Sequence, residues 1–337
     1  MKAIVCEKPH DFQWKEHPKP VPREGESLVK IRQIGICGTD LHAFNGRQPF
    51  FSYPRVLGHE LAGIIEKIEG PDHGLQAGDR VVIVPYLECG TCVACRNGKT
   101  NCCTYMQVIG VHQDGGMREW ITLPTDHLIK TDSLSWDEMA LVECLSIGAH
   151  AVRRALVETG EHVLVVGAGP IGLGAMQFAK LSGAKVIAMD INEARLEYCR
   201  NEMGVEYTVN AGIQAREELQ QITDGMFPNV VMDATGNAQA MRKSLDYLAH
   251  GGRMVYIGLF DGDFSLNDPE FHKRETTLLS SRNATKADFQ QVIASMENKQ
   301  AKSSCLITHH SEFADLIENF QDWLKPESGV VKAMVHL

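Results

Sequence analysis

Apolar residues recur in short runs along the first part of the chain, and Gly or Pro interrupts most of these runs. Short runs rich in Val and Ile between turn residues are typical of β-strands. The segment 61–70 also fits a helical period, but its Ile content and the Gly70-Pro71 turn favour a strand. Residues 1–130 therefore predict a mostly-β domain, with strands expected at 1–6, 27–36, 61–70 and 79–86.

A helical period follows at 135–158, with Ser135 in the N-cap position. Gly148 lies inside this stretch. Because glycine weakens a helix interior, Gly148 is a candidate for dividing the stretch into two helices.

From Glu161 onward, near-continuous apolar strands alternate with amphipathic helices. Strands buried on both faces have this pattern, which predicts a parallel sheet covered by helices. From about Lys286 the chain returns to a helix, a strand, a helix and a final strand. We therefore expect an α/β protein of two domains: a nucleotide-binding domain at 149–284, and a second domain formed by 1–148 and 285–337.

Composition and charge narrow the classes of function. The chain has 43 acidic against 33 basic residues, a formal net charge of −10, and such a chain repels phosphate backbones and anionic lipid. No apolar run approaches the ~20 residues that span a bilayer. The N-terminal MKAIVCEKPHDF lacks the features of an export signal. We expect a cytoplasmic protein that binds neither nucleic acid nor membrane.

The ten cysteines include a closely spaced group. In a chain without an export signal thiols stay reduced, and clustered cysteines then more often bind metal. Cys89, Cys92, Cys95 and Cys103 form C-x2-C-x2-C-x7-C, with Cys102 as a competing fourth ligand. Four thiolates in one loop predict a closed, structural zinc site.

A second, dispersed group suggests a catalytic metal. Cys37 stands in GICGTDLH and His59 in GHE. Such a site needs a third protein ligand and an open position, and Glu60, Glu143 and Cys144 are the candidates for that ligand.

A glycine-rich turn joins the apolar strand HVLVV to a helix, and the next strand ends at Asp190. In this context GxGxxG is the fingerprint of a dinucleotide site, where the helix N-terminus receives the pyrophosphate. A carboxylate at Asp190 would accept bonds from the ribose hydroxyls and favours NAD over NADP. Arg195 nearby would either soften that preference or simply face solvent. The turn consists of Gly167, Ala168, Gly169, Pro170, Ile171 and Gly172.

Together these motifs resemble the zinc-containing medium-chain alcohol and polyol dehydrogenases. The resemblance covers essentially the whole chain through GICGTDLH, GHE, the four-cysteine loop, VVGAGPIGL and the terminal strand. It implies a GroES-like catalytic domain, a Rossmann domain, NAD, and two zinc ions per chain, one catalytic and one structural. It also implies a homo-oligomer, because relatives form dimers or tetramers.

The same resemblance assigns roles to single residues. Cys37 and His59 correspond to catalytic zinc ligands, and Glu60 follows the ligand His as in the sorbitol dehydrogenase branch. Glu143 corresponds to the third ligand or an exchanging carboxylate, although polyol enzymes have Pro where this chain has Cys144.

Thr39 and His42 correspond to a proton relay that leads away from the substrate alcohol. The zinc would polarise that alcohol, and the nicotinamide would accept a hydride.

A finer similarity to bacterial sugar-acid dehydrogenases, the L-galactonate 5-dehydrogenase group, rests on segments such as QPFFSYPRVLGHE and SSRNAT. It implies oxidation of a secondary alcohol of a small-molecule aldonate, with a neutral polyol or L-threonine as alternatives. Zinc-free quinone reductases and a catalytically silent NAD-binding regulatory protein are further alternatives, but both would lack ligands that are present here. Further candidate contacts to substrate or cofactor are Arg47, Phe50, Phe51, Arg282, Asn283 and Lys332.

Overall fold

A computed structural model describes residues 1–48 and 51–337 of the chain. These residues form two compact units, Met1–Cys144 with Ala284–Leu337 (unit 1) and Leu145–Asn283 (unit 2). The observed units meet after residues 144 and 283, whereas the sequence predicted boundaries after residues 148 and 284. Unit 2 is continuous in sequence, whereas unit 1 is assembled from two separated segments.

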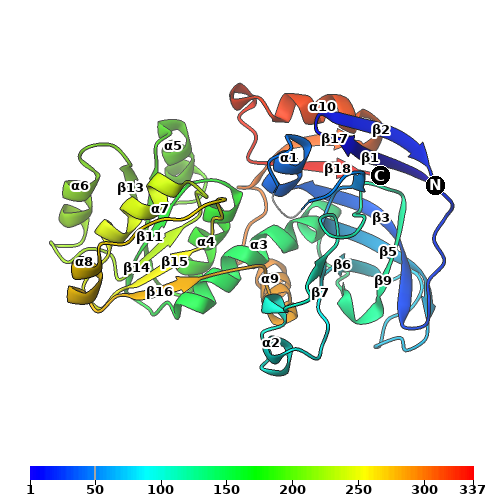
Figure 1. Cartoon of the computed structure of the whole chain (residues 1–337), viewed down its shortest axis with the longest axis horizontal. Helices are drawn as coiled ribbons and strands as arrows, with labels where there is room; N and C mark the ends of the chain where they lie inside the picture. Colours follow the sequence, from blue (N-terminus) through cyan, green and yellow to red (C-terminus); the bar gives the residue numbers. More distant parts are fainter. Residues whose placement is uncertain (49–50) are drawn as a thin grey trace. The chain divides into compact units, whose positions relative to one another are not determined.

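Unit 1 is built mainly from antiparallel strands (Figure 1). Its largest sheet has the order β10-β6-β5-β3-β18-β17, with β9 also paired to β3. A smaller sheet has the order β2-β1-β4, and β7 pairs with β8. The strands are β1 (Lys2–Lys8), β2 (Asp11–Glu16), β3 (Glu26–Ile36), β4 (Arg55–Val56), β5 (Glu60–Glu69), β6 (Arg80–Ile83), β7 (Tyr86–Leu87), β8 (Gln107–Val108), β9 (Trp120–Pro124), β10 (Leu128–Lys130), β17 (Ile307–Glu312) and β18 (Lys332–His336).

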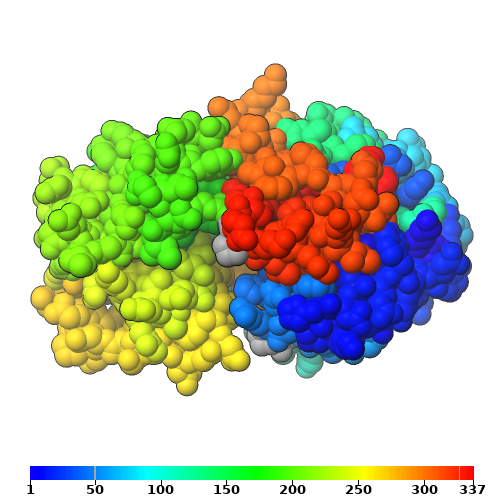
Figure 2. All heavy atoms as spheres, turned by 90° about the horizontal axis from the view of Figure 1, so that it is seen from above, coloured from blue at the N-terminus to red at the C-terminus, as the bar shows by residue number. Residues whose placement is uncertain are grey.

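The C-terminal segment completes unit 1. β18 pairs antiparallel with β3 and parallel with β17, so a strand from the end of the chain lies inside the large sheet. Figure 2 shows the C-terminal atoms, in red, packed beside the N-terminal atoms, in blue. The helices of unit 1 are α1 (Gly38–Phe44), α2 (Val93–Arg96), the first part of α3 (Trp136–Ala155), α9 (Lys286–Glu297) and α10 (Leu316–Trp323).

Unit 2 is a six-stranded parallel sheet with the order β13-β12-β11-β14-β15-β16, accompanied by helices. Leu164 and Val231 point to one face of the sheet and belong to one apolar cluster. Their chain neighbours Val163 and Val230 point to the other face and are also buried, so both faces of the sheet are covered. The elements are β11 (His162–Val166), α4 (Pro170–Leu181), β12 (Lys185–Asp190), α5 (Glu193–Asn201), β13 (Tyr207–Asn210), α6 (Ala215–Ile222), β14 (Val230–Asp233), α7 (Ala238–Ser244), β15 (Arg253–Tyr256), α8 (Asp268–Lys273) and β16 (Thr277–Ser280).

The fold class expected from the apolar pattern is confirmed, but one detail was wrong. α3 is one continuous helix, with the Ser135 hydroxyl accepting a bond from Glu138 N–H at 3.2 Å, and Gly148 does not break it. A Cβ atom at Gly148 would lie 2.5 Å from the backbone nitrogen of Ala175 in α4. Gly148 is therefore needed for close helix packing.

No helix within the described residues is both long enough and apolar enough to cross a membrane.

Candidate active site

Cys37, His59 and Glu60 present ligand atoms that all lie within 4.8 Å of one another. Cys37 follows β3 and is the N-cap of α1, while Glu60 opens β5 directly after His59. β3 and β5 are antiparallel neighbours with Gly35 opposite Glu60, and this register brings the three side chains together. A Cβ atom at Gly35 would lie 2.2 Å from Glu60 Oε2, so the glycine makes room for the carboxylate.

Glu60 is held by a cation from the other end of the chain. Lys332 Nζ donates to Glu60 Oε1 at 2.5 Å and to the Ile36 carbonyl at 3.1 Å. Lys332 is 1% exposed and Glu60 is fully buried. Lys332 was expected as a contact to substrate or cofactor, but its ammonium is buried within unit 1, where it neutralises Glu60.

His59 lies beside a buried carboxylate that the sequence motifs did not single out. Asp40 accepts bonds from the backbone N–H groups of Cys37 at 3.0 Å and Gly58 at 3.1 Å, and its Oδ1 lies 3.7 Å from His59 Nδ1. Burial opposes protonation of His59, but Asp40 and Cys37 outweigh it and raise the pKa of His59 well above its ordinary value. The surroundings of His59 thus attract a positive charge, whether a proton or a metal ion.

Glu143 lies on α3 and is not among the three converging residues. Its carboxylate accepts a hydrogen bond from the hydroxyl of Tyr86 on β7, which the sequence analysis also missed. Burial, reinforced by the neighbouring Glu60 charge, raises the pKa of Glu143 to about 7, against the opposing effect of His59. Glu143 is therefore close enough to interact electrostatically with His59 and Glu60, while one of its oxygens accepts the hydrogen bond from Tyr86.

The cluster fits a zinc ion. His59 Nδ1 and Glu60 Oε2 are buried and have no hydrogen-bond partner among the described residues. Thiolate, imidazole and carboxylate are the donors that zinc prefers, and three protein ligands leave a fourth position for substrate. The neighbouring Cys144 is fully buried and lies outside the group of converging ligands.

The residues expected around this cluster differ in their exposure. Thr39 is half-buried and His42 exposed on α1, and Arg47 is exposed after that helix. Phe51 packs against Tyr53 with ring centroids 4.8 Å apart. Phe50, another candidate contact to substrate or cofactor, lies outside the described residues.

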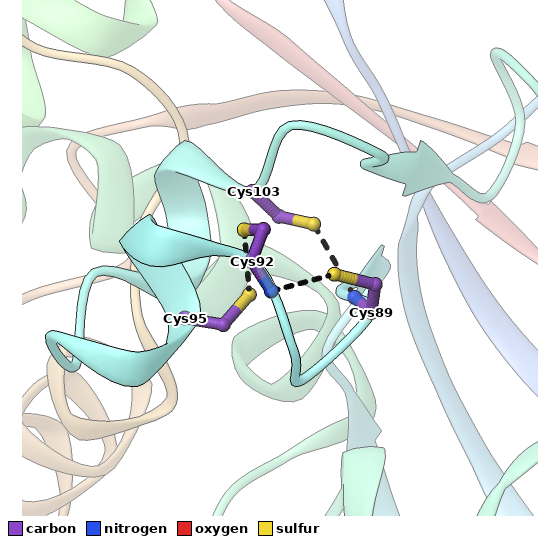
Figure 3. A group of neighbouring side chains, drawn as sticks. All are labelled: Cys89, Cys92, Cys95 and Cys103. Atoms are coloured by element: carbon purple, nitrogen blue, oxygen red, sulfur yellow. Dashed lines mark hydrogen bonds between the residues drawn. The ribbon is translucent and has the colours of Figure 1, made fainter.

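The four cysteines of the loop between β7 and β8 converge as expected from their spacing, with ligand atoms within 4.8 Å of one another (Figure 3). Cys92 Sγ lies 3.5 Å from Cys95 Sγ, and the backbone N–H of Cys89 donates to Cys103 Sγ at 3.3 Å. Cys103 is buried and belongs to the group, whereas the competing Cys102 is exposed and does not.

The electrostatics of this loop also favour a cation. Backbone N–H groups of Cys95 and Thr104 lower the pKa of Cys92 to about 5. Desolvation and hydrogen bonds to the neighbouring sulfurs raise the pKa of Cys95 to about 12. Several thiolates in one site also need a balancing charge. A divalent ion supplies that charge, and four sulfur donors leave it no open position.

The glycine-rich turn in unit 2 has the shape of a phosphate cradle. Gly167 has φ of 100°, and a Cβ at Gly172 would lie 1.8 Å from the Gly167 carbonyl. Gly169 is the N-cap of α4, ahead of Pro170, and a Cβ there would meet no atom within 4 Å. The open space at the helix N-terminus fits a pyrophosphate.

The other expected cofactor residues surround the ends of the strands. Asp190 at the end of β12 accepts bonds from Ala168 N–H at 2.7 Å and Asn192 N–H at 2.9 Å, and Arg195 is half-buried in the first turn of α5. After β16, Arg282 is exposed. Asn283 has φ of 51°, and its buried Nδ2 lacks a hydrogen-bond partner among the residues described. An unpaired amide at this position is consistent with a polar ligand.

Comparison with known proteins gives the family. Residues 23–133 match the alcohol dehydrogenase GroES-like domain, and residues 170–298 match the zinc-binding dehydrogenase domain. The chain is 43% identical to L-galactonate-5-dehydrogenase of Escherichia coli K12 over 99% of this chain and 98% of that protein. It is 34% identical to a sorbitol dehydrogenase of Bacillus subtilis, over 80% of this chain and 78% of that one.

Solved structures agree with this result. An alcohol dehydrogenase of Escherichia coli CFT073 in complex with NADH superposes with a TM-score of 0.93 at 29% identity, covering 100% of this chain and 99% of that one. The chain therefore belongs to the zinc-binding alcohol dehydrogenases, oxidoreductases with a GroES-like and a Rossmann domain, as the sequence motifs predicted.

Proposed function

We propose that the protein is a zinc-dependent dehydrogenase that transfers a hydride from a secondary alcohol of a sugar acid, such as L-galactonate, to NAD. The observation that carries this proposal is the 43% identity to L-galactonate-5-dehydrogenase across nearly the full length of both chains. The ligand clusters and the glycine-rich turn supply the parts that such a reaction needs.

In this proposal Cys37 and His59 hold the catalytic zinc together with Glu60 or Glu143. Glu60 is favoured, since a carboxylate oxygen of this residue lies in the converging cluster, its Oε2 has no hydrogen-bond partner among the described residues, and Lys332 balances the charge at Oε1. Zinc supplies Lewis-acid polarisation of the alcohol, and the nicotinamide ring accepts the hydride. Thr39, and beyond it His42, would carry the proton of the alcohol toward solvent.

The second zinc would be held by the four-cysteine loop between β7 and β8. Unit 2 would bind NAD through the N-terminus of α4, with Asp190 on the adenosine ribose. Asp190 would disfavour the phosphate of NADP by charge repulsion. Asn283 would donate its unpaired amide to the cofactor.

An aldonate carries a carboxylate that a neutral polyol lacks, so an arginine is the expected recognition group. Arg47 and Arg282 are exposed candidates. A neutral polyol is the second candidate substrate, because a sorbitol dehydrogenase is also similar to this chain. L-Threonine is a third, since L-threonine 3-dehydrogenase of Shewanella loihica is 31% identical over 98% of both chains.

The test is NAD reduction by the zinc-loaded protein with L-galactonate and other aldonates, neutral polyols including sorbitol, and L-threonine. We expect clear preference for an aldonate, and Arg282→Ala or Arg47→Ala should then raise KM for the aldonate more than it changes kcat. A preference for sorbitol, unaffected by either arginine, would overturn the sugar-acid assignment but leave the enzyme class in place.

We further propose that the protein works in the cytoplasm as a homo-oligomer. The acidic net charge supports the absence of nucleic-acid and membrane partners. Light scattering on the purified, zinc-loaded protein measures the oligomeric state directly.

A further inference from the structure

We propose that unit 1 has a third, exchangeable site for a divalent cation of the zinc and nickel class, formed by His310, Glu312 and His336 on neighbouring strands. The site is separate from both clusters described above and does not depend on the proposed substrate.

The three side chains share one face of the sheet. Glu312 on β17 is directly opposite His336 on the parallel strand β18. His310 precedes Glu312 by two residues, and residues two apart on a strand point to the same side. His-x-Glu on one strand and a His on the next therefore place two imidazoles and a carboxylate beside one another.

These side chains line a cavity of about 620 Å³ in unit 1. Its remaining lining includes Asp137 at the start of α3 and Asp315, and none of the described lining residues is Lys or Arg. The cavity therefore gathers carboxylates and imidazoles without a basic side chain to neutralise them. A cation is the ligand that this lining would attract.

A buried amide fixes which ring nitrogen of His336 is free. Gln33, 3% exposed on β3, donates from Nε2 to Asp137 Oδ1 at 2.7 Å, so its Oε1 faces His336 Nδ1 at 3.2 Å. An amide oxygen can only accept, so Nδ1 of His336 carries the hydrogen and Nε2 of the neutral ring carries a lone pair. Histidine ligands of metals are commonly held in this way by a hydrogen bond from the other nitrogen.

His310 lies beside the same network. Its Nδ1 lies 3.7 Å from Asp137 Oδ2, the second oxygen of the carboxylate that Gln33 contacts. The buried carboxamide thus orients His336, while His310 lies near the same carboxylate on the same face of the sheet.

The donor atoms of His310, Glu312 and His336 are farther apart than those of the two clusters above. Among the described residues, only those two clusters have all their ligand atoms within 4.8 Å of one another. The side chain of His310 is 62% exposed and Glu312 is also exposed, so both can rotate toward His336. We therefore expect binding that is weaker and more readily reversed than at the four-cysteine loop. A bound ion would tie the edge strand β17 to β18.

The experiment titrates zinc-loaded protein, containing its tightly held ions, with additional Zn²⁺ and separately with Ni²⁺, using calorimetry and native mass spectrometry. We expect one further ion per chain. His336→Ala and His310→Ala should each weaken its binding by about tenfold or more. Glu312→Gln, a change at an exposed side chain, should weaken it without affecting the fold.

The matched control is His309→Ala. His309 lies between His310 and Thr308 on the same strand, points to the opposite face, and bonds the Thr308 hydroxyl at 2.9 Å. The His309→Ala variant should bind the further ion as tightly as the parent protein does. Absence of a further ion, or equal loss in His309→Ala and His310→Ala, would overturn the proposal. Retention of the tightly held zinc in every variant shows that the fold is intact.

Discussion

At the scale of single residues, the buried pair of Glu60 and Lys332 supports the cluster formed by Cys37, His59 and Glu60. Neither group is accessible to solvent, so each needs the other to offset its loss of hydration. The Oε2 of Glu60 has no hydrogen-bond partner among the described residues, while Lys332 occupies Oε1. The lysine thus both stabilises the carboxylate and limits how it can turn.

Replacing Lys332 by Met, which has similar volume, should lower the free energy of unfolding by about 3–5 kcal/mol, because it leaves a buried carboxylate unpaired. Denaturant unfolding at a fixed zinc content measures the loss. The double variant Lys332→Met/Glu60→Gln should be more stable than Lys332→Met alone. If Lys332→Met unfolds like the parent protein, the pair contributes no net stability.

His127 gives a pH-dependent contribution in the same unit. Its Nδ1 contacts Asp126 at 2.8 Å and its Nε2 contacts Glu88 at 3.0 Å. Burial opposes the charge, but the bonds to Glu88 and Asp126 prevail and raise the pKa of His127 above its ordinary 6.5. A raised pKa stabilises the folded state fully below pH 6.5, and this stabilisation disappears as the pH rises through the folded-state value.

We therefore expect His127→Gln to destabilise the protein by about 2 kcal/mol at pH 6 and by much less at pH 9. Unfolding curves of both proteins at the two pH values test this, with His309→Gln as a histidine control elsewhere in unit 1. Equal destabilisation at both values would mean that the charge of His127 is not involved.

The convergence of the candidate ligands could be predicted from sequence, whereas their supporting residues could not. Cys37, His59 and the loop cysteines belong to local motifs whose spacing carries their chemistry. Lys332 is 272 positions from Glu60, and Tyr86 is 57 positions from Glu143. Such partners are brought together by strand register and helix packing, which no local spacing reveals.

At the scale of elements, two glycines of the strand–turn–helix in unit 2 have different expected roles. Gly172 is needed for packing of the fold, whereas Gly169 is expected to leave room for the cofactor. A side chain at Gly172 would collide with the backbone of Gly167, whereas one at Gly169 would enter open space. Gly169 also has φ of −80°, which alanine adopts without strain.

Gly169→Ala should leave stability within about 0.5 kcal/mol of the parent but weaken NAD binding by about tenfold or more, since the new methyl group occupies the phosphate cradle. Gly172→Ala should destabilise the chain by about 1–3 kcal/mol through overpacking. Calorimetric titration of NAD and denaturant unfolding measure the two effects. Normal NAD affinity in Gly169→Ala would show that the pyrophosphate lies elsewhere.

Element types followed from the apolar pattern, as the parallel strands of unit 2 and the long helix α3 show. The error at Gly148 has a tertiary cause. Helix propensity counts a glycine as a weakness, but the backbone of α4 approaches so closely here that only glycine fits.

At the scale of the whole molecule, each unit has an apolar core of its own. All four tryptophans, Trp14, Trp120, Trp136 and Trp323, belong to unit 1. Tryptophan fluorescence therefore reports on unit 1, while circular dichroism reports on both units. The sequence pattern indicated two domains, but not the order of the strands in their sheets, because local periodicity does not encode which strands become neighbours.

A ligand of unit 2 should consequently affect the two signals differently. Saturating NAD, at about 100 times its Kd, should stabilise unit 2 by about 2.7 kcal/mol and raise the unfolding midpoint seen by circular dichroism more than the midpoint seen by fluorescence. Zinc chelation should instead lower the fluorescence midpoint first. Coincident transitions under all conditions would show that the units unfold as one.

The position of β18 within the large sheet also has a consequence for the order of events during translation. The ribosome synthesises β3 early, yet the partner of its Gln33–Ile36 edge emerges only after all of unit 2. Unit 2 is contiguous and can fold as soon as it leaves the exit tunnel, while the N-terminal strands wait with an open edge. The nascent chain thus passes through a stage in which its nucleotide-binding half is complete and its metal-binding half is still exposed to chaperones and to aggregation.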